Sequence, residues 1–225
     1  YGDDRKTEIV ADEVEQINVE DMIKEEDMVV MISRLGYIKR VSVEKYKKQD
    51  RGGKGSNSAA LLEDDYINQL FIGSTKDYLL FITNVGKAYW IKVHEIPESE
   101  RTSRGAHIKS LLAVGPDEEI TAVVSLKEFA EDQYLFMTTA NGVVKKVHTT
   151  EFSNAKTRGI IGLKLDTGDK LISAIQTTGS TEVMLISRRG KALKIKEDSV
   201  RSMGRASCGI KGMKLAEGDE IAAAV

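Results

Sequence analysis

The chain has 225 residues, of which 41% are hydrophobic and 30% charged, enough to bury a sizeable core. No apolar run approaches the roughly 20 residues that a membrane-spanning helix needs, and the first residues do not resemble a signal peptide. One cysteine and three scattered histidines exclude a disulfide framework and argue against a metal centre. These features predict a cytoplasmic protein without a membrane partner.

The net charge of −2 is unevenly distributed. Residues 1–26 carry ten acidic and three basic side chains, a net of −7, whereas residues 27–225 carry 25 acidic and 30 basic, a net of +5. We interpret residues 1–26 as an acidic leading arm or linker and residues 27–225 as a mildly basic body. Such a body favours a polyanionic partner, although charge runs are also typical of ordinary solvated surface.

Along the body, a short turn with the pattern Ser/Thr-x-x-Gly follows a buried apolar run four times. The turns span residues 33–36, 83–86, 139–142 and 187–190, and their glycines are 50, 56 and 48 residues apart. Each apolar run has the length of a strand buried on both faces, and glycine allows the tight turn that follows. This periodicity predicts four structural repeats.

A second strand is expected after each turn. Apolar residues stand two and five positions after the glycine in all four copies, for example Ile38 and Val41 in the first. A spacing of three breaks strict alternation, which predicts a bulge or a strong twist in this strand. The position four after the glycine is basic in three copies and is Trp90 in the second.

A polar loop containing an arginine completes the first half of each repeat. It leads into an expected third strand at residues 61–62, 111–112, 163–165 and 213–215, then an acidic turn and a closing strand that begins at Ile67, Ile120, Ile172 or Ile221. Residues 221–225 also match the opening strand of a fifth repeat. No segment sustains a helical period, so we predict an all-β, propeller-like disc of four-stranded blades, with repeats at about 27–75, 76–125, 126–177 and 178–225.

The loop of the first repeat resembles a known sequence motif. Its residues are Gln49, Asp50, Arg51, Gly52, Gly53, Lys54 and Gly55. This segment resembles the glycine-rich gyrase-A box, which marks the C-terminal domain of the A subunit of bacterial DNA gyrase, a type IIA topoisomerase. Segments 1–9, 160–163 and 199–204 are also similar to that family, and Asp50 stands where a basic residue is common.

The resemblance implies a β-pinwheel whose blades exchange strands and whose basic rim binds and wraps duplex DNA without reading its sequence. Family members usually have six repeats, whereas four and one strand are visible here. The implied partners are the gyrase B subunit, together with the rest of the gyrase A subunit, in a bacterial, nucleoid-associated heterotetramer that uses ATP and Mg²⁺ elsewhere for negative supercoiling. The isolated domain is then expected to be a monomer, with no catalytic residue and no cofactor of its own.

Basic residues cluster on corresponding parts of the repeats, the second strand and the arginine-containing loop, which a radial fold places on one rim. Lysine and arginine there would bind phosphates by counterion release, and the box glycines would let backbone amides approach a phosphate. The candidate DNA-binding residues, in addition to the box, are Lys39, Arg40, Lys45, Lys47, Lys48, Arg104, Lys145, Lys146, Arg158, Arg188, Arg189, Lys191, Lys194, Lys196 and Arg205.

Alternative interpretations stay open at this stage. The strand lysines could be solvated edges that discourage aggregation, and the box could be a plain turn. For Tyr89 and Trp90 we expect packing between blades in preference to base stacking. We expect Cys208 to be a small buried filler, and residues 166–169 to form a turn in preference to a calcium loop. At the level of function, the alternatives are the equivalent domain of topoisomerase IV, which typically lacks an intact box, and a propeller-type protein-interaction module.

Overall fold

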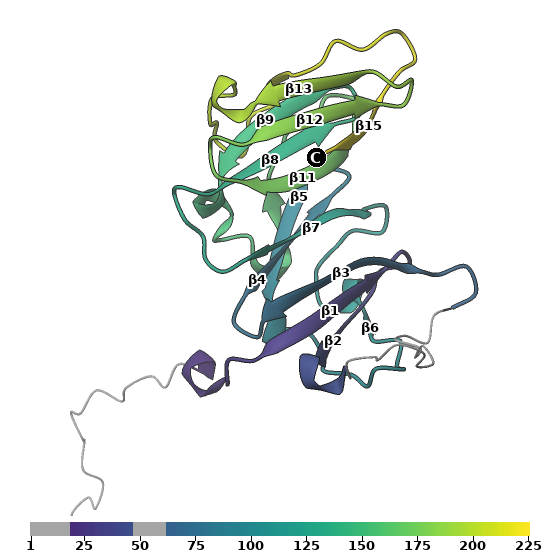
Figure 1. Ribbon diagram of the computed structural model, residues 1–225, viewed down its shortest axis with the longest axis vertical. Helices are drawn as coiled ribbons and strands as arrows, with labels where there is room; N and C mark the ends of the chain where they lie inside the picture. Colours follow the sequence, from purple (N-terminus) through teal and green to yellow (C-terminus); the bar gives the residue numbers. More distant parts are fainter. Residues whose placement is uncertain (1–18, 47–61) are drawn as a thin grey trace, which may run out of the picture.

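The computed structural model describes residues 19–46 and 62–225. Four antiparallel sheets follow one another in chain order along the long axis of the molecule, from β1 near one end to β12 and β13 near the other (Figure 1). The all-β fold with strand-built blades is therefore confirmed. No helix in the described ranges is long and apolar enough to cross a membrane.

Three strands from consecutive parts of the chain form most of each sheet. The first sheet contains β1 (Asp27–Ser33), β2 (Tyr37–Ser42) and β3 (Ile67–Ser74). The second contains β4 (Tyr78–Thr83), β5 (Lys87–Lys92) and β7 (Ile120–Leu126). The third contains β8 (Tyr134–Thr139), β9 (Val143–His148) and β11 (Leu171–Thr177), and the fourth contains β12 (Glu182–Ser187), β13 (Ala192–Lys196) and β15 (Ile221–Ala224).

A two-residue strand from the following repeat completes each of the first three sheets. These strands are β6 (Ala106–His107), β10 (Ile160–Ile161) and β14 (Ile210–Lys211), which pair with β2, β5 and β9 respectively. Within the described residues, β13 has no such neighbour, and its burial is correspondingly low. Consecutive blades are thus joined by exchanged strands as well as by packing.

Short 3₁₀ turns connect the strands and contribute no long helix. They are η1 (Val19–Met22), η2 (Val43–Lys45), η3 (Val93–Glu95), η4 (Ile108–Ser110), η5 (Thr149–Phe152), η6 (Lys156–Arg158) and η7 (Glu197–Ser199).

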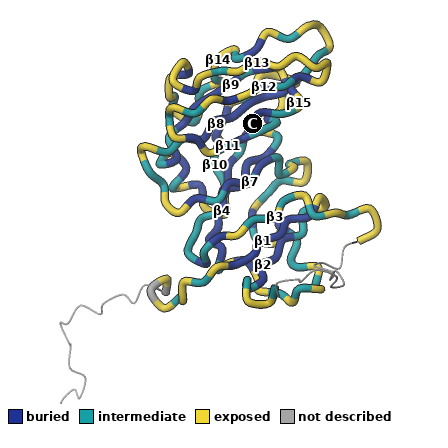
Figure 2. The backbone as a smooth tube through the Cα atoms, in the orientation of Figure 1, coloured by how far each residue is buried: buried dark blue, intermediate teal, exposed yellow. Residues whose placement is uncertain are grey.

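The hydrophobic core consists of three clusters, each between two neighbouring sheets. One joins the first and second sheets around Phe81 and Tyr89, one joins the second and third around Leu80 and Met137, and one joins the third and fourth around Phe136. The first strands of the first three sheets are buried over nearly their whole length (Figure 2). Both faces of a central sheet therefore meet a neighbour, which explains the continuous apolar runs in the sequence.

Of the bulge or strong twist expected in the second strand, the bulge is absent from all four described pairs of first and second strands. Strands β1 and β2 pair in regular register, and the irregularity lies instead between β1 and β3, at Ile32 and Ser33, with equivalents in the other sheets. The spacing of three between Ile38 and Val41 arises because the next blade covers the second strand, so residues on both of its faces are buried.

The expected third strand is also misplaced. The actual strands β6, β10 and β14 lie just before the apolar residues that were expected to form it, and they join the preceding sheet instead of their own. Leu112, Leu163 and Met213 are buried, but in irregular backbone that turns back into the core. Residues 221–225 do not open a fifth repeat here, because β15 is the closing strand of the fourth sheet, paired with β12.

Candidate nucleic-acid interface

The two edges of the sheets have different neighbours. The closing strands β7, β11 and β15 contact one another from sheet to sheet. The opposite edge carries β6, β10 and β14, and in the fourth sheet it is β13, which among the described residues pairs with β12 on one side only. The segments that lead into the three short strands, residues 98–105, 152–159 and 202–209, are called the arginine loops below, and they lie along this second edge.

A glycine ends each arginine loop and explains why the loop can sit so close to the preceding sheet. Gly105, Gly159 and Gly209 all have positive φ, between 74° and 93°. A Cβ atom at Gly105 would lie 2.4 Å from the carbonyl oxygen of Ile38, and one at Gly159 would lie 2.3 Å from the ring of Tyr89. Only glycine meets both requirements, so these positions fix the loops against the second strands.

Several candidate cations on this edge are open to solvent. Arg104 and Arg158 are exposed, each one residue before its loop glycine, and Arg205 is half-buried in the third loop. On and beside β13, the exposed candidates are Arg189, Lys191 and Lys196. In the part of the chain that the structure describes, no carboxylate forms an ion pair with these six side chains. Two of them have other partners: Arg205 Nη1 donates to the carbonyl of Ile161 at 3.3 Å, and the guanidinium carbon of Arg104 lies 5.5 Å from the ring centre of Tyr37.

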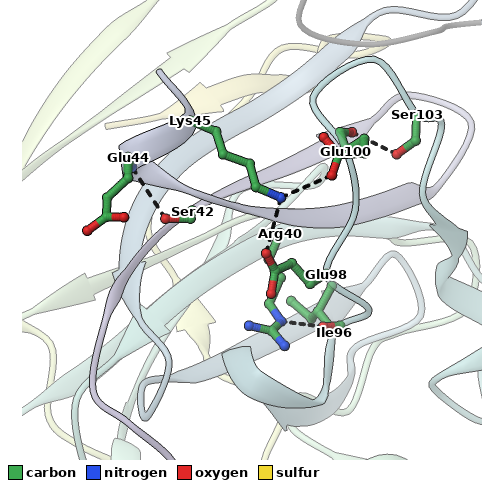
Figure 3. A network of polar contacts seen from close by, with 8 residues as sticks. All are labelled: Arg40, Ser42, Glu44, Lys45, Ile96, Glu98, Glu100 and Ser103. Atoms are coloured by element: carbon green, nitrogen blue, oxygen red, sulfur yellow. Dashed lines mark hydrogen bonds and ion pairs between the residues drawn. The ribbon is translucent and has the colours of Figure 1, made fainter. Parts of the chain in front are cut away.

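Three other candidates are exposed but paired. Lys45 Nζ lies 3.3 Å from both Glu98 Oε1 and Glu100 Oε1, across the junction between the first two blades (Figure 3). Arg188 Nε lies 2.6 Å from Glu220 Oε1, and Lys194 Nζ lies 2.9 Å from Glu182 Oε2. Exposed pairs of this kind contribute little free energy, so a phosphate could exchange with the carboxylate.

The assignment of Lys39, Lys145 and Lys146 to a DNA-contacting rim is wrong. Their exposed fractions are 2%, 0% and 7%, because the following blade covers them. Lys145 Nζ donates to three backbone carbonyls, and Lys146 Nζ donates to the carbonyl of Glu197 at 3.1 Å. Arg40 is half-buried, and its Nε donates to the carbonyl of Ile96 (Figure 3). The basic residues of β2 and β9 therefore connect blades.

Burial also changes the proton affinity of two of these lysines. Removal from water lowers the pKa of Lys145 to about 8, and the same cause lowers the pKa of Lys39.

The remaining candidates lie outside the described residues. They are Lys47, Lys48 and the whole gyrase-A box, namely Gln49, Asp50, Arg51, Gly52, Gly53, Lys54 and Gly55. Their part in DNA binding stays a prediction.

The sequence analysis did not include Arg101 among the basic residues of the arginine loops. Counting back from the loop glycines, Arg101 and Arg205 both stand four residues before their glycine, so they are the corresponding pair. Arg101 is half-buried, with its guanidinium carbon 5.9 Å from the ring centre of Tyr46. Alignment on the glycine instead of on the nearest arginine would have found it.

The minor predictions have mixed outcomes. Tyr89 is fully buried between blades, and Trp90 packs on Tyr78 and donates from Nε1 to a backbone carbonyl, so their packing role is confirmed. Residues 166–169 form a hydrogen-bonded turn as expected. Cys208, however, is exposed, so the prediction of a small buried filler is wrong.

Comparison with known proteins agrees with the geometry. The family described as "DNA gyrase C-terminal domain, beta-propeller" matches residues 27–74, 77–127, 133–178 and 181–225. The DNA gyrase A subunit of Treponema pallidum is 59% identical over 207 residues, covering 92% of this chain and 26% of that protein. The A subunit of Escherichia coli K12 gyrase is 44% identical over 221 residues, covering 98% and 25%.

Two solved structures share the fold. A DNA gyrase A C-terminal domain superposes with a TM-score of 0.70 at 35% identity, over 88% of this chain and 64% of that one. The C-terminal domain of a DNA topoisomerase IV gives a TM-score of 0.77 at 30% identity, over 90% and 62%. The chain spans about a quarter of the length of the curated relatives it matches. With four matched segments covering most of its residues, the chain belongs to the DNA gyrase C-terminal domain family of β-propellers.

Proposed function

We propose that this chain binds duplex DNA without sequence preference and wraps it along the edge formed by the arginine loops and β13. The observation that carries the proposal is a set of solvent-exposed cations without a carboxylate partner among the described residues: Arg104 and Arg158 stand at corresponding positions of two successive arginine loops, and the exposed cations on and beside β13 continue the same edge. Repetition matters because bending DNA costs a few kcal/mol over about 20–30 base pairs, so many weak contacts must share that cost.

The surrounding assembly is part of the same proposal. Relatives that are 39–59% identical to the chain over the aligned residues are A subunits of DNA gyrase, of which it would form a C-terminal part. We place it in a bacterial complex with the gyrase B subunit, joined to the rest of the A subunit, where ATP and Mg²⁺ are used outside this chain and the DNA is negatively supercoiled.

The salt dependence of DNA binding tests the interface. We expect the logarithm of the affinity for a duplex of about 40 base pairs to fall linearly with the logarithm of salt concentration, because each neutralised phosphate releases about 0.9 counterions. Arg104→Ala/Arg158→Ala should weaken binding and reduce the slope by about 2, in a fluorescence-anisotropy titration at several salt concentrations.

The control variant removes two positive charges from the opposite edge of the sheets, which the closing strands form. Lys127→Ala/Lys170→Ala changes two exposed lysines that flank the closing strands β7 and β11. Lys170 Nζ lies 3.9 Å from Glu220 Oε2, a long pair that contributes little free energy. This variant should keep nearly the full slope. Equal losses in the two variants would contradict an interface on the arginine-loop edge, and binding that does not respond to salt would contradict DNA binding through phosphates altogether.

A further inference from the structure

Two buried lysines occupy the same position in two repeats and hold the same part of the next one. Lys39 and Lys145 each stand three residues after the glycine of the Ser/Thr-x-x-Gly turn, in β2 and β9. Lys39 Nζ donates to the carbonyls of Arg101 at 2.6 Å and Ser103 at 2.9 Å. Lys145 Nζ donates to the carbonyls of Arg205, Ser207 at 2.9 Å and Gly162 at 3.0 Å.

Two of the accepting carbonyls at each junction correspond residue for residue. Arg101 and Ser103 stand four and two residues before Gly105, and Arg205 and Ser207 stand four and two residues before Gly209. The backbone contacts beside them repeat as well: Ser99 N donates to the carbonyl of Arg40, and Met203 N donates to the carbonyl of Lys146. The first and third junctions between blades are therefore built in the same way.

The chemistry of the contact explains why a lysine is used. An ammonium group has three donors and no acceptor, and all three donors of Lys145 have a carbonyl partner. None is left for a phosphate, and the side chain has no exposed surface. A loop with few regular hydrogen bonds offers carbonyl oxygens, and a buried cation is the group that can bind several of them at one point.

We propose that Lys39 and Lys145 are positioning residues, which fix the first and third arginine loops so that their arginines face DNA. The inference rests on the proposed DNA-binding function and adds residues that do not touch DNA themselves. Removing either lysine side chain is therefore expected to weaken DNA binding because the loop is displaced, and not because a contact between that lysine and a phosphate is lost.

The other two repeats show that the position is specialised. At the second junction Tyr89 replaces the lysine, its hydroxyl donates to Glu118 Oε2 at 2.8 Å, and its ring packs under Gly159. In the fourth repeat the residue is Leu193, which is exposed, with no arginine loop against it among the described residues. Lysine thus stands at the first and third junctions, whereas the second arginine loop lies against Tyr89.

The single cysteine of the chain allows a direct test, because Cys208 is exposed and lies in the loop that Lys145 holds. A nitroxide attached to Cys208 reports the mobility of that loop in the free protein by electron paramagnetic resonance. In Lys145→Met we expect the spectrum to shift from a restrained to a mobile form. The matched control is Lys39→Met, the same substitution at the other junction, which should leave the Cys208 label restrained.

Binding to a duplex of about 40 base pairs supplies the second readout. Lys145→Met should reduce the slope of affinity against salt by about 1 and weaken binding by about fivefold, as for one lost phosphate contact at Arg205. If this variant does not fold, Lys145→Gln, which keeps two donors, should give intermediate label mobility and a smaller loss.

The outcomes separate the inference from the function on which it rests. A label that stays restrained in Lys145→Met, or one that also becomes mobile in Lys39→Met, overturns the positioning role. A mobile label with an unchanged salt slope also overturns it, because the loop would then not matter for DNA. Failure of the unsubstituted chain to bind DNA would defeat the proposed function, while the label would still show whether Lys145 holds the loop.

Discussion

The glycines that end the arginine loops have a positive φ and no space for a Cβ atom, and substitution of single glycines tests whether both features matter. Gly159 combines a φ of 74° with a distance of 2.3 Å from a built Cβ to Tyr89 Cε1. Gly159→Ala should lower the free energy of unfolding by more than about 2 kcal/mol, since left-handed strain alone costs about 1–2 kcal/mol and the clash with a buried ring adds to it. Urea denaturation measures the loss.

Gly168 provides the control for backbone strain alone. Its φ is 81°, and a Cβ there would meet no atom within 4 Å. Gly168→Ala should therefore cost only about 1 kcal/mol. Equal costs at the two positions would show that the approach of the loop to Tyr89 is not tight.

The buried ammonium of Lys145 predicts a pH dependence. Burial holds its pKa at about 8, against an ordinary value of 10.5; nearby Cys208 and Glu151 oppose this shift, and Arg205 adds to it. Below about pH 8 the group is charged in both the folded and unfolded states, so unfolding exchanges no proton. Between about pH 8 and 10.5 the unfolded chain binds a proton that the folded chain has lost, so its contribution to stability rises with pH.

Lys145→Met isolates this contribution because methionine does not titrate. The difference in unfolding free energy, unsubstituted chain minus variant, should be larger at about pH 9.5 than at about pH 7.5, by at most about 1.4 kcal/mol per pH unit. Urea denaturation of both proteins at the two pH values measures the difference. A difference that stays constant or shrinks would mean that the carbonyls keep the lysine protonated.

At the scale of the elements, hydrophobic periodicity predicts the long strands well and the exchanged strands poorly. The first and second strands of each repeat were found because each is an apolar run next to a turn with a required glycine, as at Gly36 and Gly86. The strands β6, β10 and β14 have only two residues each and pair outside their own repeat. Local pattern carries no information about such a partner.

The same limit explains the errors in the predicted interface. The cluster of basic residues on the second strands is real, but a lysine that binds carbonyls and one that binds phosphate look the same in a sequence. Exchange of strands covers Lys39 and Lys145 with the next blade, whereas Arg104 and Arg158 precede the exchanged strands and stay in water. The topology, not the composition, separates the two groups.

The acidic arm is the element with the strongest charge. Its described end is anchored on the second blade, where Lys92 Nζ lies 2.8 Å from Glu20 Oε2 and lowers the pKa of that carboxyl. Glu20 and Lys92 also line a cavity of about 270 Å³ with Lys156 of the second arginine loop. An arm of net charge −7 held so near a cationic loop should compete with DNA.

Deleting residues 1–18 tests this competition and leaves the Glu20 anchor in place. We expect the affinity for duplex DNA to rise, most strongly at low salt, where charge repulsion is least screened. The measurement is the same anisotropy titration, with the unsubstituted chain in parallel. No change in affinity at low salt would mean that the arm is only a linker.

At the scale of the whole molecule, the exchanged strands bring the arginine loops of successive repeats onto one edge of the stacked sheets. Each junction places the arginine loop of one blade on the edge of the blade before it, so cations from successive repeats follow one another along a single edge. The closing strands meet on the opposite side and keep the blades in sequence. A polyanion long enough to contact several blades must follow the path that this edge takes from blade to blade, and we propose that this path bends the DNA.

Wrapping can be measured directly as a change in DNA topology. A nicked plasmid is sealed by ligase in the presence of increasing amounts of the 225-residue chain, and the linking number of the closed product is read on a gel. We expect a protein-dependent shift in linking number that Arg51→Ala/Lys54→Ala weakens and Lys127→Ala/Lys170→Ala leaves in place. Binding of the plasmid with no shift in its linking number would contradict the claim that this chain wraps DNA.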